Sequence, residues 1–98
     1  MSAQDTLKDR QTKYGEFTEN AVISQDIKKL YRTQPNFYEE LAPDQQEALD
    51  IIASKISRIL TGNPNYPDNW HDIQGFAKLV ENRLLTGSSY KEPTKKGK

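Results

Sequence analysis

Two stretches of this chain repeat charged residues at the spacing of an α-helix. The first stripe consists of Glu47, Ile51, Lys55 and Arg58, and the second of Asp68, Asp72, Gly75, Leu79 and Arg83. Residues three or four positions apart lie on the same side of a helix, so each stripe forms one surface. If the two surfaces face each other across a groove, a lysine and an arginine meet two aspartates, and Gly75 allows a close approach.

Two interpretations use these basic residues. In the first, Lys55 or Arg58 pairs with Asp72 or Asp68, and the ion pairs hold the helices in register. In the second, Lys55 and Arg58 contact the phosphate of a small molecule, since cationic side chains form strong hydrogen bonds with phosphate oxygens. Further phosphate contacts would come from Lys29 or Arg32, and a base would stack on Tyr14, Phe17 or Trp70.

A third interpretation uses the acidic residues. Carboxylates bind magnesium, and a magnesium ion that bridges phosphate oxygens assists their hydrolysis. The metal ligands would be Glu47, Asp50, Asp68 and Asp72. No metal or other cofactor is expected if this enzymatic alternative fails.

Other chemical signals in the sequence are weak. His71 is the only histidine, and its position beside Trp70 indicates a solvated helix site. The segment containing Arg10, Lys13, Tyr14 and Gly15 is better explained as a basic segment anchored by an aromatic ring than as a ligand contact. Glycine-rich phosphate loops and the HExxH and CxxC patterns are absent from the sequence.

The composition limits the class of protein. The chain has 98 residues, 34% of them hydrophobic, no cysteine and 14 basic against 14 acidic residues. A balanced charge disfavours general nucleic-acid binding, and no apolar run is long enough for a membrane span or signal core. We therefore expect a protein of the cytoplasm, and self-association would help so small a domain to reach stability.

The elements that position the stripes can be read from apolar spacing and from helix-terminal residues. One helix is expected from about Glu19 to Thr33, with Thr18 or Asn20 as N-cap. A second begins at Pro43 and runs to about Thr61, with Gly62 as its stop. A third follows the turn at 63–68, with Asp68 as N-cap, and ends near Gly87.

Apolar residues on each long helix form a stripe expected to face the core. The stripes are Leu49, Ile52, Ala53, Ile56, Ile59 and Leu60 in the second helix, and Trp70, Ile73, Ala77, Val80 and Leu84 in the third. Residues 34–41 predict an ordered connector, and residues 4–13 a short polar helix or a frayed segment. The prediction is an all-α antiparallel bundle of three main helices plus a short N-terminal segment, with one domain at 1–87 and a disordered tail at 88–98.

A combination of short motifs resembles a family of small phage and prophage proteins of unknown function. The marks lie within residues 10–84: Tyr14-Gly15, Glu47-Ala48-Leu49, Lys55 with Arg58, Gly62-Asn63-Pro64, and Asp68-x-Trp70-x-Asp72-Ile73-x-Gly75-Phe76. Members often carry a tyrosine in place of Phe76 and an aspartate in place of Asn63. The resemblance implies a phage or prophage origin and a role in the host cell.

More distantly, the pattern is similar to the all-α nucleoside triphosphate pyrophosphohydrolases of the MazG type. That resemblance implies a helical, commonly oligomeric scaffold. Those enzymes bind magnesium with an ExxE pair on one helix and an ExxD set on another. Glu47-x-x-Asp50 fits ExxD, but the ExxE partner is missing, and Asp68 and Asp72 are spaced i, i+4 instead.

We therefore favour non-catalytic binding of a nucleotide or related phosphorylated ligand by a homo-oligomer. The expected ligand contacts are Tyr14, Lys55, Arg58, Asp68 and Asp72. Two alternatives remain: magnesium-dependent nucleotide pyrophosphohydrolysis, and a module that binds a host protein. In the second, Ile51, Leu79 and the aromatic residues of the connector would form the contact.

Overall fold

The computed structural model describes residues 3–87 and is all-α, with five helices in that range: α1 (Ala3–Tyr14), α2 (Phe17–Arg32), α3 (Pro35–Glu39), α4 (Pro43–Thr61) and α5 (Pro67–Leu85). The count differs from the expected three main helices and one short segment because the connector forms a helical turn of its own. The predicted tail at 88–98 lies outside the described residues. Within residues 3–87, no helix combines the length and apolar character needed to cross a bilayer.

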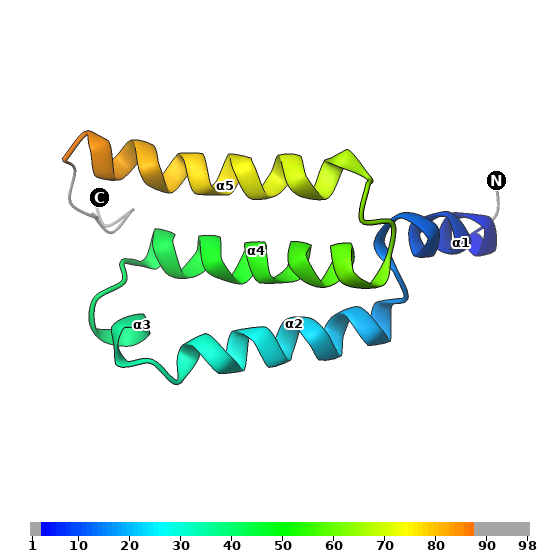
Figure 1. Cartoon of the computed structure of the whole chain (residues 1–98), viewed down its shortest axis with the longest axis horizontal. Coiled ribbons are helices and arrows are strands. Elements are labelled where there is room, and N and C mark those ends of the chain that lie inside the picture. Colours follow the sequence, from blue (N-terminus) through cyan, green and yellow to red (C-terminus); the bar gives the residue numbers. More distant parts are fainter. Residues whose placement is uncertain (1–2, 88–98) are drawn as a thin grey trace, which may run out of the picture.

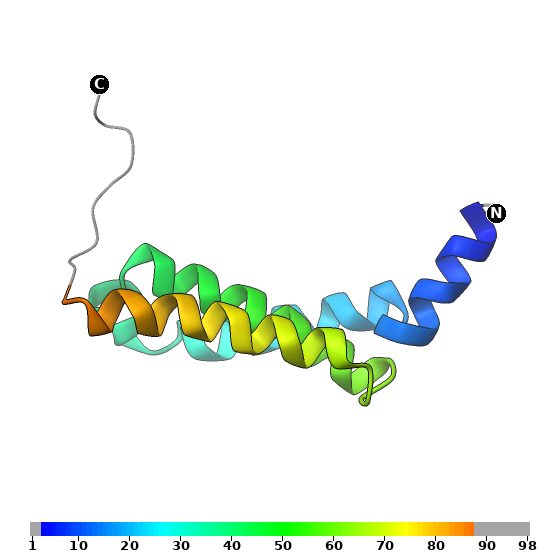
Figure 2. The same cartoon turned by 90° about the horizontal axis from the view of Figure 1, so that it is seen from above.

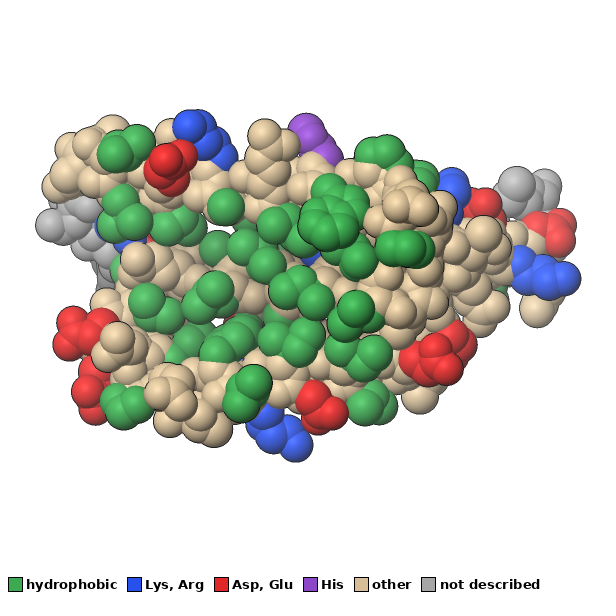
Figure 3. Space-filling model, in the orientation of Figure 1, with side chains coloured by type: hydrophobic (Ala, Val, Ile, Leu, Met, Phe, Trp, Pro, Cys, Tyr) green, Lys and Arg blue, Asp and Glu red, His purple; other side chains and the backbone are tan. Residues whose placement is uncertain are grey.

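Helices α2, α4 and α5 lie side by side in a single layer, with α4 in the middle (Figure 1). Seen edge on, α1 leaves this layer at the end where α2 begins (Figure 2). Only α4 packs extensively against both of the other long helices. A layer of this kind has two broad faces, and no helix of the described chain lies across the face shown in Figure 3.

Local signals explain where the helices begin and end. Pro43 occupies the first turn of α4, and Gly62 is its C-cap, both as predicted. The predicted N-caps are wrong. The carboxylate of Glu16, rather than Thr18 or Asn20, accepts the backbone N–H of Glu19 at 3.0 Å, and Asp68 lies within the first turn of α5, because that helix already begins at Pro67.

Figure 3 shows hydrophobic side chains over α2, α4 and α5 on one broad face of the layer, and several residues of the two apolar stripes are exposed. Among the described residues, the buried apolar side chains are Phe37, Ala48 and Ala53. Leu60 is 65% exposed and Trp70 is 54% exposed. The stripes therefore do not form a closed core within residues 3–87, because no helix of that range covers them.

A contact between two glycines joins the α1–α2 turn to the end of α4. Gly15 is buried with φ of 86°, and a Cβ atom on it would lie 2.0 Å from Oγ1 of Thr61. A Cβ on Gly62 would lie 2.5 Å from the backbone nitrogen of Gly15. The backbone N–H of Asn63 also donates to the carbonyl of Lys13 at 3.2 Å. No side chain fits between these segments, so they can touch only as glycines.

We expect Gly15→Ala to lower the free energy of unfolding by about 2–4 kcal/mol, since it adds both left-handed strain and a clash with α4. Urea unfolding of the purified chain measures this. Gly75→Ala is the control, because nothing lies within 4 Å of a Cβ at that helical position. It should raise the free energy of unfolding by up to about 1 kcal/mol, and an equal loss in both variants would contradict the glycine contact.

Candidate functional site

The interface between α2 and α4 is built from small polar side chains. The hydroxyls of Ser24 and Ser54 lie 3.2 Å apart. The Asn20 side-chain oxygen accepts hydrogen bonds from Ser57 at 3.2 Å and from Thr61 at 3.0 Å. Small residues let the two helices approach closely, and their hydrogen bonds satisfy the polar groups that this approach buries.

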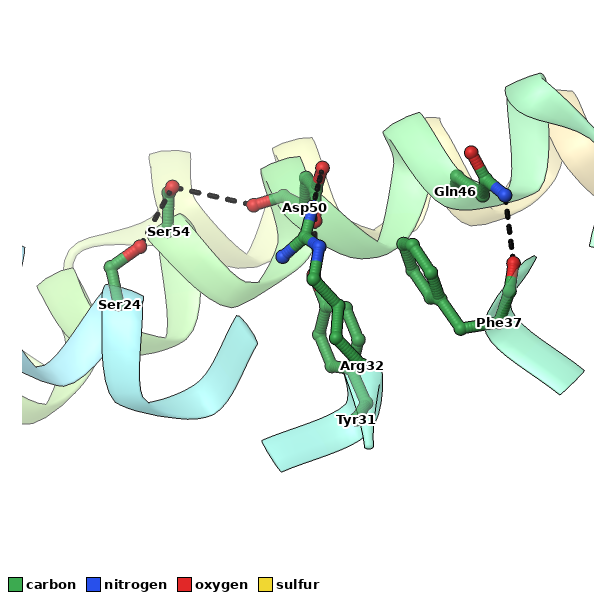
Figure 4. A network of polar contacts seen from close by, with 7 residues as sticks. All are labelled: Ser24, Tyr31, Arg32, Phe37, Gln46, Asp50 and Ser54. Atoms are coloured by element: carbon green, nitrogen blue, oxygen red, sulfur yellow. Dashed lines mark hydrogen bonds and ion pairs between the residues drawn. The ribbon is translucent and has the colours of Figure 1, made fainter. Parts of the chain in front are cut away.

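Further along the same interface, an ion pair joins α2 to α4 (Figure 4). The Arg32 guanidinium donates to both oxygens of Asp50, at 2.8 and 2.7 Å, and the hydroxyl of Tyr31 donates to the same carboxylate. The guanidinium carbon also lies 4.8 Å from the ring centroid of Phe37, and the Gln46 side-chain amide donates to the Phe37 carbonyl at 2.7 Å. Asp50 of α4 therefore holds Arg32 of α2 in place, and Arg32 in turn lies against Phe37 of α3.

One residue from each predicted stripe meets the other between α4 and α5. Lys55 and Asp72 form an ion pair at 2.9 Å, which is the pairing that the first interpretation expects. The hydrogen bond from Lys55 is the main cause of the lowered pKa of Asp72. Gly75 plays no part in the approach, because no atom lies near the place where its Cβ would be.

Tyr14, at the end of α1, contacts residues of both α4 and α5. Its hydroxyl donates to Asp68 at 3.3 Å, and the guanidinium carbons of Arg10 and Arg58 each lie 5.1 Å from its ring centroid. Burial is the main cause of the raised pKa of Tyr14, with Tyr66 and Asp68 adding to it. Of the five predicted ligand contacts, Tyr14 therefore contacts Arg58 and Asp68, while Lys55 and Asp72 contact each other.

Beside Tyr14, the helices α1, α2 and α4 enclose a pocket of about 370 Å³. Three cationic side chains line it, one from each helix: Arg10, Lys28 and Arg58. Three hydroxyls from the α2–α4 interface also line it: Ser24, Ser54 and Ser57. Glu16 is the single carboxylate among the lining residues, and it caps α2.

The pocket cations differ from most other basic residues of the described chain: Lys8 and Lys29 also lack an ion pair, but neither lines the pocket. Lys13, Arg32, Lys55, Lys78 and Arg83 each form an ion pair with a carboxylate. Within residues 3–87, Arg10, Lys28 and Arg58 have no carboxylate at ion-pair distance. Three unpaired positive charges beside hydroxyl groups form a surface that favours an anion.

The four predicted metal ligands do not come together. In the part of the chain that the structure describes, no group of three histidine, cysteine, aspartate or glutamate side chains is placed to hold a metal ion. Asp50 is bound by Arg32 and Asp72 by Lys55, while Glu47 is exposed.

His71 is exposed, as predicted. The indole N–H of Trp70 donates to the Pro64 carbonyl at 2.8 Å, and the ring is 54% exposed.

Comparisons of this chain with models of protein families, with curated proteins and with solved structures found no match. The chemistry of the pocket must therefore be inferred from its own residues. Sequence reasoning gave no site role to Lys28 or the serines, and it favoured a basic segment over a ligand contact for Arg10, which lines the pocket. The available signal was a polar stripe at helical spacing on each helix, namely Asn20, Ser24 and Tyr31 on α2 and Asp50, Ser54, Ser57 and Thr61 on α4.

We expect acid to weaken the fold through Asp44 and Asp72. Arg83 hydrogen-bonds Asp44 at 2.6 Å and lowers its pKa, as Lys55 does for Asp72. A carboxyl whose pKa is lower in the folded than in the unfolded state stabilises the fold above the unfolded pKa of about 3.9, and this stability is lost as pH falls through the folded value. Melting temperature measured between about pH 7 and 2.5 should decline steeply below about pH 4.

Asp44→Asn and Asp72→Asn test this assignment. Each should melt below the parent at pH 7 and approach it at the acid end of the range. The control is Asp26→Asn, which removes an exposed carboxylate that has no ion pair among the described residues. A difference from the parent that stays constant across the range would contradict the role of these two pairs.

Proposed function

We propose that this chain is a phage-encoded accessory protein of the host cytoplasm that binds a nucleotide or related phosphorylated small molecule without catalysis. One observation carries the proposal: three cations from three helices line one pocket and lack carboxylate partners. The resemblance to small phage proteins supports the origin and the setting. The antiparallel helical bundle predicted from the sequence belongs to the same proposal, as the scaffold that holds the pocket.

The pocket suits a ligand with a phosphate and a planar group. Arg10, Lys28 and Arg58 would neutralise the phosphate and donate hydrogen bonds to its oxygens. The exposed Phe17 ring lines the same pocket and offers an apolar surface on which a base could lie. Its volume of about 370 Å³ lies within the range of small-molecule sites, roughly 300–1,000 Å³.

The other predicted contacts act indirectly in this proposal. Tyr14 orients Arg10 and Arg58, which both lie against its ring, and Asp68 fixes the Tyr14 hydroxyl. Lys55 forms the ion pair with Asp72. Arg58 therefore remains available for the ligand. Positioning of this kind is how a second layer of residues supports a binding site.

We expect a nucleotide that binds the pocket to raise the melting temperature by about 10–20 °C at a concentration one hundred times its Kd. The probes are inorganic pyrophosphate and a panel of nucleoside mono-, di- and triphosphates and cyclic nucleotides, each with and without magnesium. Arg58→Gln and Lys28→Gln should abolish the shift. Lys78→Gln, which removes one exposed charge away from the pocket, should keep it.

Three results would contradict the proposal. The first is no shift with any probe, which would favour a host-protein partner. The second is a shift that survives in Arg58→Gln, which would place the ligand elsewhere. The third is magnesium-dependent release of pyrophosphate or phosphate from a nucleotide, which would support the enzymatic alternative instead.

A further inference from the structure

The face of the layer opposite the pocket is almost entirely apolar. Helical geometry separates the two sides, since residues nine positions apart lie two and a half turns apart and point in opposite directions. Leu49 and Arg58 of α4 have this spacing, and so do Trp70 and Leu79 of α5. We call the side with Leu49 and Trp70 the apolar face. Leu30 of α2 belongs to this face by the same spacing, because it lies nine positions from Ala21, which lines the pocket. Exposed members of the face are Leu30, Leu49, Ile56, Leu60, Trp70 and Leu84.

The apolar face is continuous and has its charges at the rim. Figure 3 shows hydrophobic side chains joined across α2, α4 and α5, with acidic and basic side chains gathered at the edges. From their exposed fractions, the six residues present on the order of 600 Å², at the top of the range of about 300–600 Å² for the largest patch of a monomer. A standard protein interface buries about 800 Å² per partner, and half-buried neighbours such as Ile52 and Ile73 add to the six.

We infer that the apolar face is the surface on which a second copy of this chain docks, layer against layer. The residues at this face are the helical stripes that would be the core of a closed bundle, and among the described residues only Phe37, Ala48 and Ala53 are buried apolar side chains. A chain whose apolar stripes stay this exposed needs a cover whenever it is folded. Another copy is the one partner that is present whenever the chain is.

A second copy also matches the face in shape and charge. Two identical flat apolar surfaces can meet about a two-fold axis, and no like charges are forced together because the charges lie at the rim. Residues 88–98 are a poor cover, since Tyr90 is their only large apolar or aromatic side chain. Helix α1 is also unavailable, because it lines the pocket on the opposite side of α4. The docking therefore adds a second layer and leaves both pockets open.

The experiment measures the mass of the purified full chain by sedimentation and by light scattering over a range of concentrations. The native chain should have at least twice its monomer mass of 11.3 kDa. Leu60→Glu should reduce the mass to that of the monomer. The matched control is Leu79→Glu, which places the same charge at a leucine of equal exposure, 64% against 65%, on the opposite side of the layer, and it should keep the native mass.

If Leu60→Glu fails to fold, dilution of the native chain tests the same inference. Trp70 is the only tryptophan and lies on the apolar face, so dilution of the native chain should shift its fluorescence to longer wavelength as copies separate. The melting temperature should also fall on dilution, as mass action requires for a folded oligomer.

A native chain that stays at 11.3 kDa, with dilution-independent fluorescence and melting, would overturn the inference. So would dissociation by Leu79→Glu in place of Leu60→Glu. The ligand proposal is tested separately, because Arg58→Gln should leave the mass unchanged.

Discussion

The central position of α4 in a single helical layer is the constraint from which the rest of the structure follows. Because only α4 packs extensively against both other long helices, its side chains divide into four groups: those toward α2, those toward α5, and those on each broad face. Toward α2, toward α5 and on the side of the pocket, α4 carries polar side chains. The ion pairs and hydrogen bonds with the neighbouring helices satisfy many of these groups. The fourth direction holds Leu49, Ile56 and Leu60, whose burial is the largest apolar contribution still available to the chain.

The polar character of the α2–α4 interface has a physical reason. Ser24, Ser54 and Ser57 have short side chains, so the helices can lie close together, and each hydroxyl has a hydrogen-bond partner. An interface of this kind gains little hydrophobic stabilisation, because small polar groups bury little apolar area. It gains specificity instead, since a shift of one residue would leave the Asp50 carboxylate without Arg32. The same small side chains leave the space that becomes the pocket beside Arg58.

Signals that act within a few residues could be predicted from the sequence. The limits of α4 follow from Pro43 and Gly62, and the Lys55–Asp72 pair follows from two stripes with i, i+4 spacing. The predicted N-cap residues were wrong because several polar residues near the start of a helix can act as N-cap, and the backbone geometry selects one of them. The contact of Gly15 with Gly62 was not foreseen, although both residues were singled out separately, because it joins segments 47 positions apart.

The two broad faces illustrate a limit of a different kind. Helical periodicity identifies which residues share an apolar side, and here it does so correctly for α4 and α5. It cannot say whether that side is covered by the same chain or by another, because the two cases have the same pattern. The pocket was missed in part for a related reason, since Lys28 and Ser54 acquire a role only when α1 is placed against α2 and α4.

The proposed ligand and the proposed second copy would both act on α4 while occupying opposite sides of it. Arg58 and Leu49 belong to the same helix, so binding at the pocket stabilises the element whose apolar side the second copy covers. If the chain folds fully only when copies associate, a ligand that binds the folded form also favours association by mass action. The coupling needs no movement of the pocket, because folding itself links the two sites. A chain with this few buried residues can thereby respond to a small anion through its oligomeric state.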